Sequence, residues 1–147
     1  MDAFVQPLYE LADFDAIIRQ LKKPGIVQVS GCLDSQKAHF TNGLLREFPF
    51  RLIVAENDLK AKAFYEDFRL YDPEVLYYPA RDLIFYQADV SGGDLVRERM
   101  RVLRALLEKR PVTIVTTMSA LMMPQTPLSG IVSRILHFDK KSTVDER

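Results

Sequence analysis

Four residues of one short segment carry most of the chemical information in this sequence. Gly31 and Lys37 have the spacing of a Walker A loop, G-x-x-x-x-G-K-[ST], in which backbone N–H groups and the lysine hold phosphate. Gln36 stands in place of the second glycine of this pattern, and Ala38 stands in place of its serine or threonine. The segment therefore has the outline of a phosphate loop without two of its working groups.

Each replacement removes a defined chemical role. The side chain of Gln36 restricts the backbone that would wrap the phosphates, and the methyl group of Ala38 cannot bind Mg²⁺ as a hydroxyl does. Asp34 adds a negative charge where phosphate would lie, and the later apolar strand ends in Thr116 and Thr117 instead of an acidic metal ligand. We therefore expect no nucleotide, metal or other cofactor and no catalytic residue in this chain.

A basic stripe is the second candidate. Arg97, Arg101 and Arg104 fall on one face of an expected helix and can contact a phosphate or an acidic partner. Nearby Asp94 and Glu98 favour a solvated face supported by ion pairs instead. We favour the solvated face and keep the partner or DNA contact as the alternative.

The remaining reactive or aromatic residues have ordinary interpretations. Tyr77, Tyr78, Phe85 and Tyr86 can form a surface for stacking bases, but such residues more often fill the core beneath a loop. Cys32 is the only cysteine, which excludes an internal disulfide, and no base near it in the sequence indicates reactivity.

Composition places the chain among ordinary globular domains. It has 147 residues, 48% hydrophobic and 27% charged, with a formal net charge of zero. Zero net charge gives no global basic field that would attract nucleic acid. The acidic N-terminus does not resemble a signal peptide, and no apolar stretch is long enough to span a membrane. We expect a cytoplasmic protein.

The order of elements predicts an α/β domain with a parallel sheet covered on both faces, P-loop or RecA-like but degenerate and partial. Apolar, β-branched runs alternate with helical patterns, and this organisation continues to about residue 127. A last run over 131–138 alternates like a strand, so we expect a boundary at residue 128. The expected strands are 26–30, 51–55, 75–78 and 112–116, and the expected helices are 8–21, 38–48, 58–71, 91–109 and 118–123.

Capping signals support three of these helices, and an apolar stripe supports one of the three. Asp34 or Ser35 can cap the second helix, and Asn57 or Asp58 can cap the helix after the second strand. Ser91 opens the long helix as a capping box, and Val96 and Met100 begin its expected apolar stripe, which continues through later leucines.

Taken in order, these segments resemble the N-terminal region of bacterial transcription-repair coupling factors (Mfd), whose first domains look like those of the excision-repair helicase UvrB. The loop at 78–86 is similar to the family's P-x-x-E-x-L-P-Y-D, with Asp82 in place of the glutamate, while Ile84 and Phe85 depart from the pattern. The other resembling segments are 31–38, 51–57, 64–68, 97–103 and 112–122.

The resemblance implies a function that the residues alone do not. Proteins of this family displace RNA polymerase stalled at a DNA lesion and recruit UvrA for transcription-coupled nucleotide excision repair. Their ATP-driven, Mg²⁺-dependent motor acts on double-stranded DNA and lies in C-terminal domains. The resemblance implies a non-catalytic module over residues 1–127, like UvrB domain 1a, and the start of a domain-2-like unit over 128–147, with the main UvrA contacts further on.

Two alternatives remain open at this point. The chain can instead be a small P-loop-type nucleotide-binding enzyme in which Lys37 still holds phosphate. A third possibility is non-specific DNA binding through Arg97, Arg101 and Arg104, with an affinity that falls steeply with salt.

Overall fold

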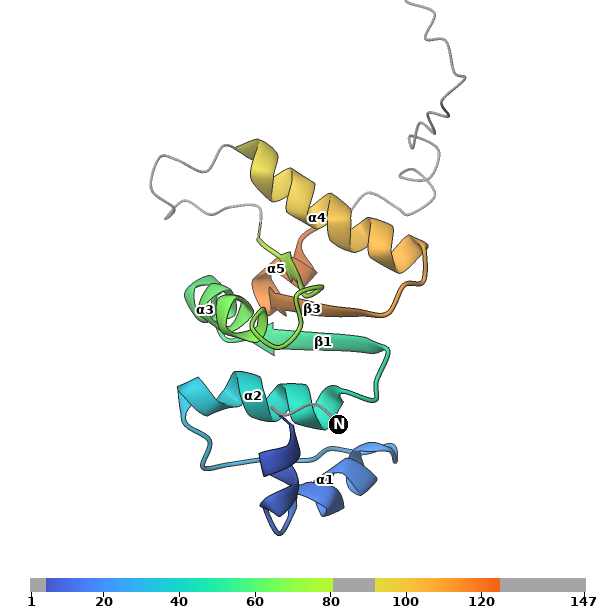
Figure 1. Ribbon diagram of the computed structural model, residues 1–147. Helices are drawn as coiled ribbons and strands as arrows, with labels where there is room; N and C mark the ends of the chain where they lie inside the picture. Colours follow the sequence, from blue (N-terminus) through green and yellow to red (C-terminus); the bar gives the residue numbers. More distant parts are fainter. Residues whose placement is uncertain (1–4, 81–91, 125–147) are drawn as a thin grey trace, which may run out of the picture.

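The computed structural model describes residues 5–80 and 92–124 (Figure 1). At its centre lies a parallel sheet of three strands, β1 (Phe50–Ala55), β2 (Leu76–Tyr78) and β3 (Val112–Thr117), in the spatial order β1-β3-β2. The prediction of an α/β domain with a parallel sheet is confirmed. Its topology, with flanking helices and a central strand that comes last in the chain, is of the Rossmann and P-loop kind.

Strand β3 is buried along its whole length because it lies between the other two strands. Its sequence, Val-Thr-Ile-Val-Thr-Thr, is β-branched throughout, which suits a pleated surface packed on both faces. Successive side chains enter opposite cores: Ile114 lies in one apolar cluster and Val115 in another. Both faces of the sheet therefore need apolar cover.

Helix α3 (Asp58–Phe68) covers the Val115 face of the sheet, and α2 (Asp34–Leu45) packs against α3 and adds Ala38 to the same apolar cluster. Phe68 is fully buried there. The backbone N–H of Lys60 donates to the Asn57 side chain at 2.9 Å, so the predicted cap of α3 is confirmed.

Helix α4 (Gly92–Leu107) and the short helix α5 (Met118–Met122) lie on the opposite, Ile114 face. Val102 and Ala105 of α4 pack against Ile114, and both are almost completely buried. This cover extends over β2 and β3 but stops short of β1.

Strand β1 consequently presents a bare apolar row on this face. Leu52 is the partner of Ile114 in the register of the two strands, so both side chains point to the α4 side. Phe50 is 52% exposed and Leu52 is 55% exposed. In the part of the chain that is described, β1 pairs with β3 alone, so its outer edge is also open.

The apolar stripe predicted for α4 is wrong in its orientation. Val96 and Met100 are exposed, whereas Arg99 is only 4% exposed. The Arg99 guanidinium donates to the Pro79 carbonyl at 2.5 Å and to the Tyr78 hydroxyl at 2.7 Å, so a cation takes an inward position. It also lies over the Tyr78 ring, 4.1 Å from its centroid. The two hydrogen bonds satisfy the buried guanidinium, so Arg99 can take an inward position while Val96 and Met100 face outward.

The single helix predicted over 8–21 is divided in the structure. A 3-10 helix, η1 (Gln6–Glu10), precedes α1 (Phe14–Leu21), and extended backbone at Leu11 separates them. Together they form a third apolar cluster against α2, of which Val5, Leu8, Phe14, Ile18 and Leu44 are the buried members.

The strand predicted over 26–30 is also wrong: residues 26–33 have no regular secondary structure. Ile26 is 94% exposed and Val29 is 42% exposed. β-Branched residues favour a strand, but a strand exists only where a neighbouring strand takes its backbone hydrogen bonds. The described sheet does not supply that neighbour.

A mostly buried polar cluster around Asp72 connects the strands of the sheet. One carboxylate oxygen of Asp72 accepts hydrogen bonds from Arg51 at 2.9 Å and from the Thr113 hydroxyl at 2.7 Å. Its other oxygen accepts from the backbone N–H of Glu74 at 3.1 Å. Asp72 therefore joins β1, β3 and the turn before β2.

Several predictions fall outside the described residues. These are the Ser91 cap, the loop residues Phe85 and Tyr86, the strand-like run at 131–138, and the domain boundary at residue 128. Among the helices that are described, none is long and apolar enough to cross a membrane.

The packing of η1 on α2 gives a stability prediction at Gly43. A Cβ added at Gly43 would meet Leu8 Cδ1 and would come within 2.9 Å of Phe14 Cζ. We expect Gly43→Ala to lower the free energy of unfolding by about 1–3 kcal/mol in urea titrations, because overpacking outweighs the gain in helix propensity. In a Leu8→Ala background, Gly43→Ala should cost less than it does in the wild-type chain, because the closest clashing atom is absent. A stabilising Gly43→Ala substitution would contradict this packing.

Candidate functional site at the phosphate-loop segment

The phosphate-loop segment, residues 31–38, leads into the N-terminus of α2. Gly31 has a φ of +86°, a left-handed conformation that favours glycine, and a Cβ there would meet no atom within 4 Å. The helix begins at Asp34 with Leu33 as its N-cap residue, so the expected side-chain cap from Asp34 or Ser35 is wrong. Backbone conformation, rather than a close neighbour, accounts for Gly31.

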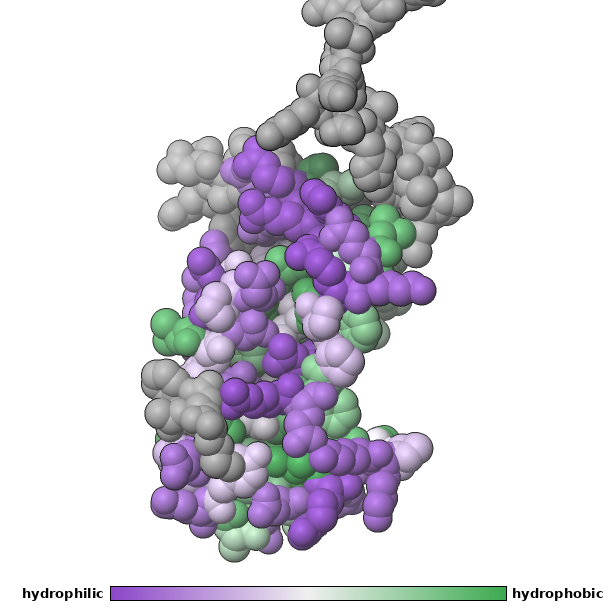
Figure 2. Space-filling view, turned by 45° about the vertical axis from the view of Figure 1, so that its right-hand side comes forward, coloured by the Kyte–Doolittle hydropathy of each residue, from purple (hydrophilic) through white to green (hydrophobic). Residues whose placement is uncertain are grey.

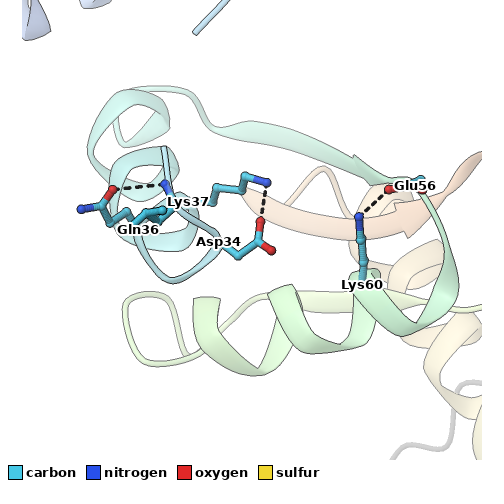
Figure 3. Close-up of polar contacts among 6 residues, drawn as sticks. Asp34, Gln36, Lys37, Glu56 and Lys60 are labelled. Carbon is cyan, nitrogen blue, oxygen red and sulfur yellow. Dashed lines mark hydrogen bonds and ion pairs between the residues drawn. The ribbon is translucent and has the colours of Figure 1, made fainter. Parts of the chain in front are cut away.

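Gln36 turns back onto the start of its own helix (Figure 3). The backbone N–H of Leu33 donates to Gln36 Oε1 at 3.2 Å. In a Walker A loop, N–H groups at this point face the phosphates. Here the Gln36 side-chain oxygen takes the place of a phosphate oxygen at one of these donors, the Leu33 N–H.

Lys37 is held by a carboxylate of the same loop. Its ammonium group lies 2.5 Å from Asp34 Oδ1, and both side chains are exposed (Figure 3). The hydrogen bond from Lys37, aided by its charge, lowers the pKa of Asp34, so this carboxylate is ionised at neutral pH. An incoming phosphate would have to displace a partner that is covalently part of the loop.

Ala38 faces the protein interior. It is 1% exposed and belongs to the apolar cluster that includes Phe68 and Val115. The position that carries the metal-binding hydroxyl in a Walker A loop is therefore a packing position in this protein.

A second ion pair lies across the cleft from the first. Lys60 Nζ lies 2.6 Å from Glu56 Oε2, and this contact lowers the pKa of Glu56 and raises that of Lys60 (Figure 3). The cleft between α2 and the carboxyl end of β1 has a volume of about 390 Å³. The charges of these two ion pairs cancel and Asp67 in the lining adds a negative charge, so the cleft presents no net positive charge to a triphosphate.

The carboxyl end of β3 holds a polar cluster that sequence reasoning missed. The Thr117 hydroxyl donates to Asp58 at 3.2 Å, lies 2.9 Å from the Ser119 hydroxyl and accepts from the Ala120 N–H. The sequence signal was available, because the carboxyl ends of parallel strands meet at one edge. The cluster has one carboxylate, and the described residues contain no group of three or more His, Cys, Asp or Glu able to hold a metal.

The basic stripe on α4 is exposed, as expected. Arg97 pairs with Asp94 at 3.2 Å, and Arg104 pairs with Glu108 at 2.7 Å. Hydrophilic side chains cover the outward side of α4 in Figure 2. These pairs support the solvated-face interpretation of Arg97, Arg101 and Arg104, and contact with a partner or DNA stays a prediction.

The aromatic residues of β2 are core residues. Tyr77 is 7% exposed and Tyr78 is 6% exposed, so neither offers a ring face for bases. The core interpretation is confirmed for these two. Sequence reasoning missed Arg99, whose guanidinium lies over the Tyr78 ring, because an arginine in an amphipathic helix is ordinarily assigned to solvent.

Comparison with protein-family models, with curated proteins and with solved structures gave no match.

Glu98, beside the basic stripe, gives a pH-dependent prediction. Burial raises its pKa, against smaller opposing effects of Arg101 and Lys62. A carboxyl whose pKa is higher in the folded state costs stability once pH rises through that pKa. We expect Glu98→Gln to raise the free energy of unfolding at pH 7, measured in urea, and to have little effect near pH 3.

The exposed Glu10 supplies a matched control, since Glu10→Gln removes a surface charge without the burial effect. Equal effects of Glu98→Gln at both pH values would mean that the substitution acts through packing and not through ionisation.

Proposed function

We propose that this chain is a non-catalytic, partner-docking scaffold, and that it forms the N-terminal module of a transcription-repair coupling factor. In this proposal its fold is a degenerate RecA-like domain related to domain 1a of UvrB. The observation that carries the non-catalytic part is the closed phosphate loop. Lys37 is paired with Asp34, the Gln36 side chain accepts the hydrogen bond of the Leu33 N–H, and Ala38 is buried.

Energetic reasoning favours this proposal over a nucleotide-binding enzyme. Nucleotide binding would have to break the Lys37–Asp34 pair and leave Asp34 facing phosphate, a like-charge contact. It would also lack a hydroxyl ligand for Mg²⁺ at Ala38. The ordered resemblance along the chain supports the repair context, with UvrA and RNA polymerase as partners of the whole protein.

A calorimetric titration with ATP and Mg²⁺ tests the non-catalytic part. We expect no saturable heat for the wild-type chain up to millimolar nucleotide. Asp34→Asn should also bind no Mg²⁺–ATP, because Ala38 still lacks the metal-binding oxygen. Micromolar binding that weakens in Lys37→Ala would establish the rival nucleotide-binding enzyme and end the scaffold proposal.

The docking part needs a positive test with purified UvrA. We expect a polypeptide that continues through the following domain to capture UvrA in a surface-binding assay, and the 147-residue chain to bind at least tenfold more weakly. The resemblance places the main contacts beyond the first domain. If the longer polypeptide fails to bind UvrA while remaining folded by circular dichroism, the assignment to repair coupling is wrong.

A further inference from the structure

An apolar groove that none of the described elements covers lies on the α4 side of the sheet. It has a volume of about 360 Å³ and is bounded by α4, α5 and β1. Parallel sheets in α/β domains are covered on both faces, but the row over β1 is about half exposed. We call this feature the β1 groove, and the residues that define it are Phe50, Leu52, Leu103, Leu106 and Leu121.

We propose that residues 131–138 of this same chain occupy the β1 groove. The first reason is position. Leu121 of α5 forms part of the wall of the groove, and α5 ends one residue later at Met122. The chain therefore leaves the described fold at the edge of the groove that needs cover.

The second reason is reach. The connection between residues 124 and 131 can span at most about 23 Å when extended. Strand β1, with its six residues, is about 20 Å long. The segment can therefore reach Leu52, in the middle of β1, from the end of α5.

The third reason is chemical match. The segment reads Ile-Val-Ser-Arg-Ile-Leu-His-Phe and is followed at once by the charged residues 139–141. Its apolar side chains match a groove whose lining is almost wholly aliphatic and aromatic. Arg51 is the one charged residue in that lining, and it is already paired with Asp72.

The fourth reason is the tether. A segment attached next to its site acts at an effective concentration in the millimolar range. A second copy of the chain, or a separate protein at micromolar concentration, must bind far more tightly to displace it. The tethered segment is therefore the favoured occupant.

This inference is independent of the proposed function. It assigns residues 131–138 to the sheet of the first domain, against the expectation that a second domain begins at residue 128. In a separate second domain, these residues would lie away from Leu52.

Disulfide trapping tests the inference in the full chain. With Cys32→Ser as background, Leu52→Cys is combined with Leu136→Cys and oxidised at low micromolar concentration. We expect a monomeric, internally cross-linked product on non-reducing gels. The matched control pairs Leu136→Cys with Leu70→Cys, at the 77% exposed Leu70 just after α3, and should cross-link at least fivefold less.

Stability supplies a second readout. We expect Leu136→Asp to lower the Tm by several degrees and Lys140→Asp to leave it unchanged, because only the first places a charge in the groove. Disulfide-linked dimers through Leu52→Cys would show that a second copy fills the groove. Equal trapping at both positions, or no trapping at Leu52→Cys, would show that the segment lies elsewhere, and each of these results overturns the inference.

Discussion

Strand β3 must be buried on both faces, and the arrangement of the other elements follows from this constraint. Its apolar side chains require cover from helices on opposite sides of the sheet. Its threonines add a further requirement, because a buried hydroxyl needs a hydrogen-bond partner. Thr113 donates to Asp72, Thr116 to the Tyr78 carbonyl and Thr117 to Asp58. The central strand thereby fixes the turns that surround it.

The phosphate-loop segment shows how a motif can keep its spacing and lose its chemistry. Gly31 and Lys37 retain the separation found in nucleotide-binding loops. However, Lys37 and the Leu33 N–H have partners within the loop, and Ala38, at the metal-binding position, lies in the core. Asp34 neutralises Lys37, and Gln36 takes the Leu33 N–H. The fold places a helix N-terminus near the carboxyl edge of a parallel sheet, where a phosphate could bind. The side chains of the loop block this position.

Much of the fold could be predicted because periodicity and caps are local signals. The strands at 51–55, 75–78 and 112–116 and the Asn57 cap were predicted correctly to within a residue or so. The prediction of a strand at 26–30 was wrong because a strand needs a neighbouring strand to pair with, and the local sequence cannot specify that neighbour. The prediction of the buried face of α4 was wrong because Arg99, a polar residue, has hydrogen-bond partners in the interior, Tyr78 and Pro79.

The sequence by itself determined the class of fold and the chemical deficit of the loop. Residue type decides these outcomes directly: Ala38 has no oxygen in any conformation, and β-branched runs between helical patterns favour a parallel sheet. Only the tertiary structure decided that Lys37 is neutralised by Asp34, that Asp58 meets Thr117, and that the described helices leave an apolar face of β1 without cover. These features depend on distances between atoms of separate elements or turns, and such distances are set by packing.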